Sequence, residues 1–377
     1  MSLNLRYLPL LAAIQENPLG TLDELAKRAE MSRPTVAKRL EELQGYREIG
    51  DAKDKAPMKK YFYVNPLLNL ESLGLELVQA FVEVKSYKKL ETMEVLTTNH
   101  PYTSYRGRCY GYFNGLLLQF RIPQGTLSHL KEFLDSVIRD GIASNYEMWR
   151  LNDGRSTYTS MSVKGWKPEI LTWDFDWKNW FEIKSQNLQQ PSMATRKGES
   201  LDWLTRKDIH LMNEVMLDAR RRNTEIISEL EKQGYSITTP TFSRRYAQIR
   251  DQCFSGYRVS IDPAAFDIYT NLLITGRDNQ EDIDTLHSRL QSHPIPFESI
   301  LRTMKNELFW TLRIQANHLS ALLSSLQTRW SEMKVSILDY SKTMRYGIWA
   351  EAFDENAHAW KEDREFMVNQ VMDSIHF

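Results

Sequence analysis

Apolar residues near the N-terminus recur with the spacing of three short helices. Pro18–Gly20 ends the first helix, whose apolar stripe comprises Leu5, Leu8, Leu11, Ala12 and Ile14. Thr21 then opens a second helix, with Glu24 three positions later as its capping-box partner. Ser32 is predicted to cap a third helix, and Pro34 is tolerated in its first turn because an amide there has no intrahelical partner.

Two helices joined by a short turn are typical of a helix-turn-helix that enters the DNA major groove. The cap and outer positions of the third helix are polar or basic: Ser32, Arg33, Thr35, Lys38 and Arg39. Ile49 and the run 61–64 predict two short strands of a hairpin, joined by a polar loop over 51–60. We therefore expect a wing in which Lys59 and Lys60 lie beside DNA phosphates.

Beyond residue 72 the pattern changes to alternating strands and helices. Strands are predicted over 75–84, 102–109, 116–122 and 143–151, and helices over 87–98 and 127–138. The order β-α-β-β-α-β indicates a ferredoxin-like unit, with both helices on one side of an antiparallel sheet.

The same order recurs after residue 201. Helices precede Thr239, which is predicted to cap a helix with Pro240 at its start. The polar positions expected to face DNA in this second helix-turn-helix are Thr239, Thr241, Ser243, Arg244 and Arg245. A strand over 257–261 follows, then strands over 269–274, 308–314 and 335–340 and helices over 283–290 and 319–330. The pairs His100-Pro101 and His293-Pro294 recur about half a chain apart, which supports a duplication.

The predicted fold class is α+β, with two winged helix-turn-helix domains and two ferredoxin-like domains in tandem. The predicted boundaries are 1–66, 72–152, a Trp-rich flap and linker over 153–200, 201–263, and 264–377 with a C-terminal flap. Each sheet leaves one face uncovered by its own helices, so the two sheets should pack face to face. We expect this contact to bury Phe81, Phe120, Leu273 and Trp310. The C-terminal Trp349, Phe353 and Trp360 echo Trp173, Phe175 and Trp180, so the repeat is expected to include the flaps.

Composition narrows the function classes only slightly. The formal net charge is −1, so no global field attracts nucleic acid, and a basic surface must be local. Cys109 and Cys253 stand apart, without metal-ligand spacing. No signal peptide or membrane-length apolar run is present, which predicts a cytoplasmic protein without membrane contact. We expect no catalytic residue, no metal and no cofactor, because phosphate-binding and hydrolase motifs are absent.

The order of elements resembles the leucine-responsive regulator/AsnC family of transcription factors. The segments LTRKDIHLMNEVMLDARRRNTEIISEL and TTPTFSRRYAQI look like the DNA-binding domain of that family. The resemblance implies a regulator that binds double-stranded DNA, a ligand-sensing ferredoxin-like domain and dimerisation, here within one chain that can associate further. Gly111-Tyr-Phe-Asn114 resembles the family's effector-site turn, with Asn114 in place of Asp, so Gly111 and Asn114 are candidate effector residues.

Two other functions stay open. Siroheme decarboxylases resemble the same family fold and use His and basic residues around a tetrapyrrole, which points to His100, Tyr102, Arg106 and Arg108. The paired His-Pro sequences are also explained by duplicated loop-to-strand junctions. The third alternative is an interaction module that has lost DNA binding, which agrees with the near-neutral charge and the lysine-poor second wing.

Overall fold

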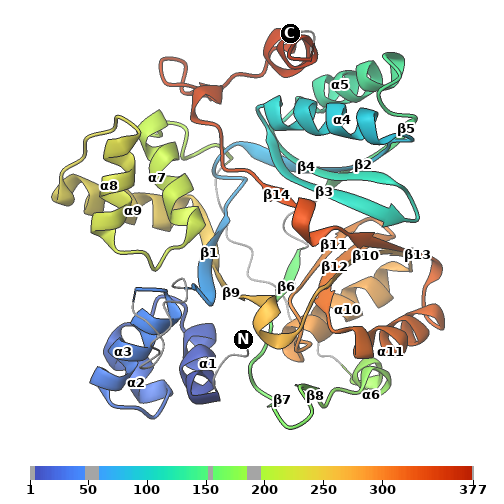
Figure 1. The fold of residues 1–377 in the computed structure, drawn as a ribbon. Helices are drawn as coiled ribbons and strands as arrows, with labels where there is room; N and C mark the ends of the chain where they lie inside the picture. The colour runs from blue at the N-terminus through green and yellow to red at the C-terminus, as the bar shows by residue number, and fades with distance from the viewer. Residues whose placement is uncertain (1–4, 47–58, 152–155, 185–196, 376–377) are drawn as a thin grey trace.

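The computed structural model describes residues 5–46, 59–151, 156–184 and 197–375, and Figure 1 shows them as two helical heads beside two sheet-and-helix units. The first head contains α1 (Leu8–Glu16), α2 (Leu22–Arg28) and α3 (Arg33–Leu43). Thr21 and Glu24 form the predicted capping box, and the hydroxyl of Ser32 accepts from the Thr35 amide. Both predicted caps are therefore confirmed. Such caps form because the first amides of a helix have no partner within the helix.

The second head contains α7 (Arg206–Leu217), α8 (Asn223–Lys232) and α9 (Thr239–Gln252). The predicted cap of α9 is wrong by one residue, since Thr238 has the extended N-cap conformation and Thr239 is already helical. The Thr238 hydroxyl donates to the Thr241 hydroxyl instead of accepting from a backbone amide. Pro240 occupies the first turn, as expected.

The predicted wing strand pairs with a strand from the other half of the chain. β1 (Phe62–Leu68) runs antiparallel to β9 (Phe254–Ile261), from Phe62 opposite Ile261 to Leu68 opposite Phe254. The sequence did not predict this pairing, and the expected hairpin stays a prediction because Ile49 and most of its loop lie outside the described residues. A local hairpin is the usual choice for neighbouring strands. Here β1 pairs instead with β9, the equivalent strand of the second half.

Both ferredoxin-like units have the predicted element order. The first comprises β2 (Leu75–Glu83), α4 (Tyr87–Asn99), β3 (Thr103–Gly111), β4 (Gly115–Pro123), α5 (Leu127–Arg139) and β5 (Asn145–Leu151). The second comprises β10 (Thr270–Arg277), α10 (Gln280–Ser292), β11 (Ser299–Met304), β12 (Glu307–Ile314), α11 (Ala316–Gln327) and β13 (Ser331–Leu338). Figure 1 shows α4 and α5 on the outer side of one sheet and α10 and α11 against the other.

The two sheets are joined at an edge and also meet face to face. β3 pairs with β13 through Tyr110 and Ile337, which makes one continuous sheet in the order β5-β2-β4-β3-β13-β10-β12-β11-β6. The ring of Phe309 then lies 6.1 Å from Phe81 and 5.0 Å from Trp149, across the gap between the units.

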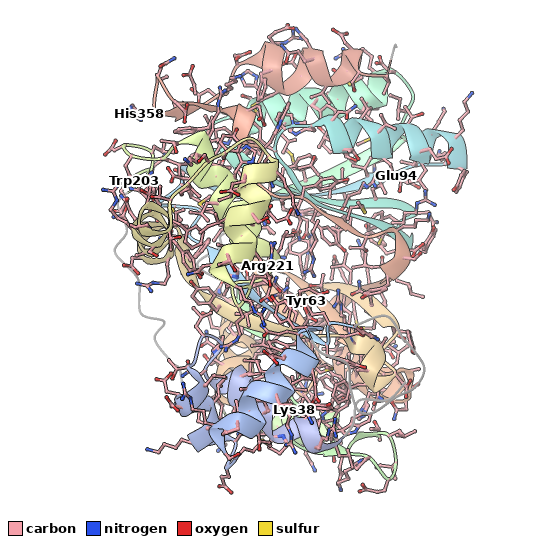
Figure 2. All side chains as sticks on the ribbon, turned by 60° about the vertical axis from the view of Figure 1, so that its left-hand side comes forward. Lys38, Tyr63, Glu94, Trp203, Arg221 and His358 are labelled. Atoms are coloured by element: carbon pink, nitrogen blue, oxygen red, sulfur yellow. The ribbon has the colours of Figure 1, made fainter. Side chains whose placement is uncertain are left out.

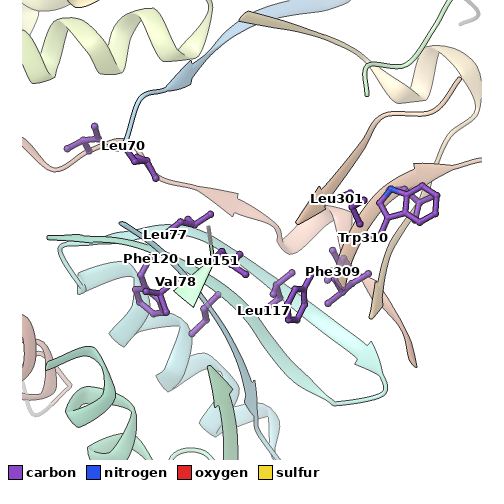
Figure 3. Packing of buried hydrophobic residues seen from close by; sticks show 14 of the residues in the cluster. Leu70, Leu77, Val78, Leu117, Phe120, Leu151, Leu301, Phe309 and Trp310 are labelled. Atoms are coloured by element: carbon purple, nitrogen blue, oxygen red, sulfur yellow. The ribbon is translucent and has the colours of Figure 1, made fainter. Parts of the chain in front are cut away.

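Two of the four residues expected in the contact between the sheets are on the wrong face. Side chains alternate along a strand, so Phe81 and Phe309 face the other sheet while Phe120 and Trp310 face their own helices. Phe120 packs on the ring of His100, and Trp310 packs near Trp177 and Trp330. Figure 3 shows Phe309 near Leu117 and Trp310 directed away from it.

The tail of each half crosses to the sheet of the other half. β6 (Thr157–Thr159) pairs with β11, and β14 (Met344–Arg345) pairs with β3. Small hairpins follow both crossings, β7 (Trp166–Lys167) with β8 (Thr172–Trp173) and β15 (Phe353–Asp354) with β16 (Ala359–Trp360). The chain then forms α6 (Trp177–Glu182) in the first tail and ends its described part with α12 (Gln370–Asp373) in the second.

The repeat includes the flaps, but its alignment differs from the predicted one. Trp166 pairs with Trp173, and Phe353 pairs with Trp360 at the equivalent place. Phe353 therefore matches Trp166 and Trp360 matches Trp173, whereas the sequence predicted Phe175 and Trp180 as their counterparts. Trp173, Trp177 and Trp180 are buried, so this segment packs as predicted. Among the described helices, none has the length and apolar character that a membrane crossing requires.

Candidate functional site

A cavity of about 1100 Å³ lies between the two ferredoxin-like units. One wall is the inner face of the first sheet, with Leu77, Leu117 and Gln119, and the opposite wall is the inner face of the second sheet, with Asn271 and Thr311. The ribbon of β1 and β9 and the end of α7 complete the enclosure through Asn65, Pro66, Asn213, Met216 and Leu217. Both halves and one helical head thus contribute to a single site.

Five arginines line this cavity: Arg121, Arg258, Arg302, Arg313 and Arg345. Arg121 belongs to β4 of the first unit, and the other four come from β9, β11, β12 and β14. The cavity also contains Glu71, Glu214 and Glu298. Because Glu214 is paired with Arg221 at 2.7 Å, it does not neutralise Arg258, Arg302, Arg313 or Arg345.

Glu298 is the main anion among these arginines. Its carboxylate lies 3.5 Å from Arg258 and 3.1 Å from Arg313. Burial alone would raise the pKa of Glu298, but Arg258, Arg313 and Arg345 together hold it below its ordinary value. One carboxylate therefore serves three neighbouring guanidinium groups, and the cluster carries excess positive charge.

The arginine cluster has unused hydrogen-bonding capacity. The Nε atom of Arg302 and an Nη atom of Arg258 are buried and have no hydrogen-bond partner. Desolvation, together with the charges of Arg258 and Arg313, lowers the pKa of Arg345 to about 10. The Arg345 side chain is accessible from inside the cavity, although protein surrounds it. Several guanidinium groups share the single carboxylate of Glu298, so this wall favours an anionic ligand.

The cationic wall is not repeated in the first half. β4 and β12 are equivalent strands of the two halves, and each has an arginine directly before an isoleucine near its end. Arg121 of β4 is therefore equivalent to Arg313 of β12. Arg258 is equivalent to Asn65, Arg302 to Gly107 and Arg345 to Tyr158. The cavity thus has one arginine-rich wall and one largely neutral wall with Leu77 and Leu117.

Tyrosine hydroxyls are the proton donors that this cavity offers. Tyr105, Tyr158 and Tyr346 line it, and no histidine stands among its described lining residues. Burial raises the pKa of Tyr105, so its phenol keeps its proton at neutral pH. The Tyr346 hydroxyl lies 3.0 Å from Thr98 of α4, and the ring of Tyr158 lies below Arg258 at 5.8 Å.

The residues expected for a tetrapyrrole enzyme lie elsewhere. His100 is buried against Phe120 and Phe133, and burial lowers its pKa to about 3. Arg108 forms a two-bond contact with Glu94 of α4, and Arg106 donates to the Glu94 carbonyl. Tyr102 donates to the carbonyl of Lys361 in the C-terminal tail. This assignment of His100, Tyr102, Arg106 and Arg108 to a ligand site is wrong, because all four sit outside the cavity in structural contacts.

Most basic residues predicted to face DNA in the first head have partners within the chain. Arg33 pairs with Asp23 at 3.1 Å, and Arg39 donates to the Arg6 carbonyl at 2.6 Å. Lys59 pairs with Asp262 at 2.6 Å, and Lys60 pairs with Asp218. Ser32 and Thr35 share the cap, and Lys38 is exposed on α3, on the outer part of the first head in Figure 2.

The second head shows the same tendency. Arg245 makes a hydrogen bond of 2.7 Å to the buried Asp208 and lies over the ring of Trp203. Thr239, Ser243 and Arg244 are exposed, and Thr241 is partly buried. Arg220, before α8, connects the two heads, since it donates to the carbonyls of Pro18 and Gly20 at 3.0 and 2.9 Å. The role of these residues in DNA binding stays a prediction.

The two candidate effector residues lie at the turn between β3 and β4. Gly111 has φ of +130°, and a Cβ there would come within 2.7 Å of the Val335 carbonyl, so the seam between the sheets requires glycine. Asn114 is exposed. Neither residue lines the cavity, and their role as an effector site stays a prediction.

No family model matches the sequence, and no curated protein matches it. The structure is similar to that of the siroheme decarboxylase NirDL in co-complex with an iron-uroporphyrin III analogue. That match has a TM-score of 0.51 and 12% identity, and covers 98% of this chain and 99% of NirDL. A second NirDL structure gives a TM-score of 0.50 and 13% identity, with 98% of each chain covered.

This chain has a tandem Lrp/AsnC-like fold. NirDL has the same arrangement of fused halves over essentially its full length. Single-module regulators match about one half of this chain: for AsnC from E. coli the TM-score is 0.26 and the identity 15%, over 40% of this chain and 91% of AsnC. The full-length likeness to NirDL confirms the predicted α+β fold, with ferredoxin-like units in tandem.

The arginine wall was missed from the sequence, although one signal was visible. Both halves contain an apolar strand with a single arginine before its last isoleucine, at Arg121 and Arg313. A charged side chain at the same place in two buried strands is unusual unless it faces a polar cavity. Arg345 carried no such signal, because its strand belongs to a tail that crosses to the other half.

Proposed function

We propose that this protein binds a tetrapyrrole with several carboxylate side chains in the cavity between its ferredoxin-like units. The observation that carries the proposal is the arginine wall, in which Arg302 and Arg258 keep buried N–H groups without acceptors. Guanidinium groups bind carboxylates through paired, charge-assisted hydrogen bonds. A ligand with carboxylates along one edge would place them beside guanidinium groups whose charge Glu298 alone does not balance.

The size and the opposite wall of the cavity support the same ligand class. About 1100 Å³ is at the upper end of the volumes usual for small-molecule sites, which suits a macrocycle better than a free amino acid. Leu77 and Leu117 offer apolar surface against which a flat ring can pack. The full-length fold likeness to a siroheme decarboxylase is consistent with this ligand class.

The reaction we propose is decarboxylation of such a ligand. In this step the carbon–carbon bond to the carboxylate breaks, carbon dioxide leaves, and the electron pair stays on the methylene carbon, which takes a proton. No oxidant is required. Among the three tyrosines of the cavity, Tyr105 and Tyr158 lie on opposite sides, and the raised pKa of Tyr105 keeps its hydroxyl protonated at neutral pH.

The direct test is a titration of the purified chain with iron-uroporphyrin III, followed by the Soret absorbance, and then mass spectrometry of the released pigment. Binding that weakens with salt, with loss of carbon dioxide from the pigment, is the expected result. Binding with an unchanged pigment mass would retain the ligand and refute the reaction. No spectral change at any protein concentration would refute the ligand.

DNA binding is the second candidate function. The observation in its favour is the pair of exposed basic side chains on the outer helices, Lys38 on α3 and Arg244 on α9. A polar residue lies beside each on the same helix, Thr35 and Ser243. Salt-dependent binding to selected duplex DNA, measured with and without the porphyrin, tests this function separately from the first.

A further inference from the structure

The two crossing strands place equivalent residues at opposite sides of the cavity. Tyr158 of β6 lies opposite Ile300, and Arg345 of β14 lies opposite Tyr105. Ile300 and Tyr105 occupy equivalent positions in the two sheets. Their partners Tyr158 and Arg345 are therefore equivalent residues of the two halves. Each strand is short, and β14 is paired with β3 at two positions, Met344 and Arg345.

A side-chain amide of the second head holds the segment that follows β14. Asn213 of α7 donates from Nδ2 to the Ile348 carbonyl at 2.7 Å, and its Oδ1 accepts from the Ile348 amide at 2.8 Å. Asn213 also lies close to the preceding residue, Gly347. A Cβ on Gly347 would be 2.6 Å from Asn213 Oδ1, so a larger residue would displace the amide. One side chain thus binds both backbone groups of Ile348, as a neighbouring strand would.

The first head makes the corresponding contact with the other tail. Gln15 of α1 donates to the carbonyl of Met161, and its Oε1 accepts from the Val163 amide at 3.4 Å. Met161 is three residues beyond Tyr158, as Ile348 is three residues beyond Arg345. Both heads therefore anchor a tail at the same distance from its cavity-lining residue.

We propose that Asn213 is a positioning residue that holds Arg345 at the cavity wall for a carboxylate of the ligand. The inference rests on the proposed tetrapyrrole function and adds a role for the second head. Arg345 lies near Arg258 and Arg313, whose like charges oppose its position, and the two paired positions of β14 are a weak anchor. The Asn213 contact supplies a further anchor on the C-terminal side of Arg345, beyond the hydrogen bond of 3.0 Å from the Tyr346 amide to the Ser104 carbonyl.

The test compares two porphyrins on four proteins. Uroporphyrin III is rich in carboxylates, whereas mesoporphyrin carries fewer and presents a similar ring. Asn213→Leu removes the clamp, and Gly347→Ala displaces it while keeping the Asn213 amide. Gln15→Leu is the matched control, because the tail it anchors carries Tyr158 in place of an arginine. Thermal unfolding of each ligand-free variant confirms that the fold is retained.

Both Asn213→Leu and Gly347→Ala are expected to weaken uroporphyrin III binding about tenfold and mesoporphyrin binding less than about twofold. Gln15→Leu is expected to leave the ratio of the two affinities near that of the unaltered chain. Equal losses for both porphyrins in the clamp variants would indicate a merely structural contact and overturn the positioning role. Unchanged uroporphyrin III binding in both would overturn it too. If the unaltered chain binds neither porphyrin, the proposed function itself fails.

Discussion

Asn65 and Arg258 face each other at the centre of the ribbon that joins the two halves of the chain. They occupy equivalent positions in β1 and β9, yet one is neutral and the other is charged. Asn65 donates to the carbonyl of Met216 at 3.0 Å, whereas Arg258 contacts Glu298 and the ring of Tyr158. The pseudo-symmetric backbone therefore carries side chains of different function.

Replacing Arg258 by Asn makes the centre of the ribbon symmetric in sequence. We expect the fold to persist, because asparagine is already accommodated at the equivalent position of β1. The affinity for uroporphyrin III is expected to fall about tenfold, as for the loss of one charge-assisted hydrogen bond. Arg250→Asn, an exposed change on α9, is the control that should leave binding unaltered. Equal affinity for the Arg258→Asn variant and the unaltered chain would contradict the arginine wall as the ligand contact.

Glu298→Gln is expected to change stability and affinity in opposite directions. The substitution leaves Arg258, Arg313 and Arg345 without their shared carboxylate, and breaking a buried ion pair costs about 3 kcal/mol. The same change adds positive charge to the cavity and should tighten binding of a polycarboxylate. Urea unfolding measures the first effect and porphyrin titration the second. A loss of affinity would contradict a binding role for this cluster.

The lowered pKa of Glu298 also predicts an acid-sensitive contribution to stability. The carboxylate stays ionised in the folded chain below the pH at which it protonates in the unfolded chain, so the unfolded state binds more protons there. Its contribution is fully present above the ordinary glutamate pKa and is lost as pH falls through the folded value. Unfolding free energies measured between neutral pH and pH 3 should fall less steeply for Glu298→Gln than for the unaltered chain.

His100 predicts a separate pH dependence. Burial lowers its pKa from 6.5 to about 3, so the unfolded chain binds the extra proton between these values. His100 therefore lowers the free energy of unfolding by up to about 1.4 kcal/mol per pH unit as pH falls below 6.5. Asn in its place could accept from the Tyr102 amide as Nδ1 now does. The His100→Asn variant should therefore lose stability less steeply over this range, and an unchanged slope would contradict a buried neutral imidazole.

The DNA-binding hypothesis is best tested with residues that lack a structural role. Arg245 is unsuitable because its removal leaves the buried carboxylate of Asp208 without its cation. Lys38→Ala and Arg244→Ala should leave thermal stability unchanged. If the heads bind DNA, each change should reduce the salt slope by about one for every phosphate that the side chain neutralises. Identical slopes for both variants and the unaltered chain would exclude these two side chains as phosphate ligands.

Local features of the fold could be predicted from sequence because they depend on neighbouring residues. The Thr21–Glu24 capping box, the Ser32 cap and the order of strands and helices in both sheets follow from short spacings. Pairing between distant strands carries no local signal, so the pairing of β1 with β9 was not predicted. The candidate site depends on such pairings, since Arg258, Arg302 and Arg345 meet only after the two halves have joined.

The faces of the strands were also not predictable from hydrophobicity. Phe120 and Trp310 are large and apolar, as core residues should be, but the alternation along each strand places them under helices. A shift of one position exchanges the faces of a strand, so hydrophobicity alone does not identify the buried contact between two sheets.

The crossing of β6 and β14 has a consequence for the synthesis of this protein. β3 is synthesised early and pairs on one edge with β4. Its partners on the other edge, β13 and β14, are among the last strands to be made. Until then its edge remains open to pairing with other chains, which is a known route to aggregation. Contacts between such distant parts of a chain also form slowly. Completion of the fold must therefore wait for the C-terminal tail, and nascent chains of this protein should depend on chaperones more than a single-module relative does.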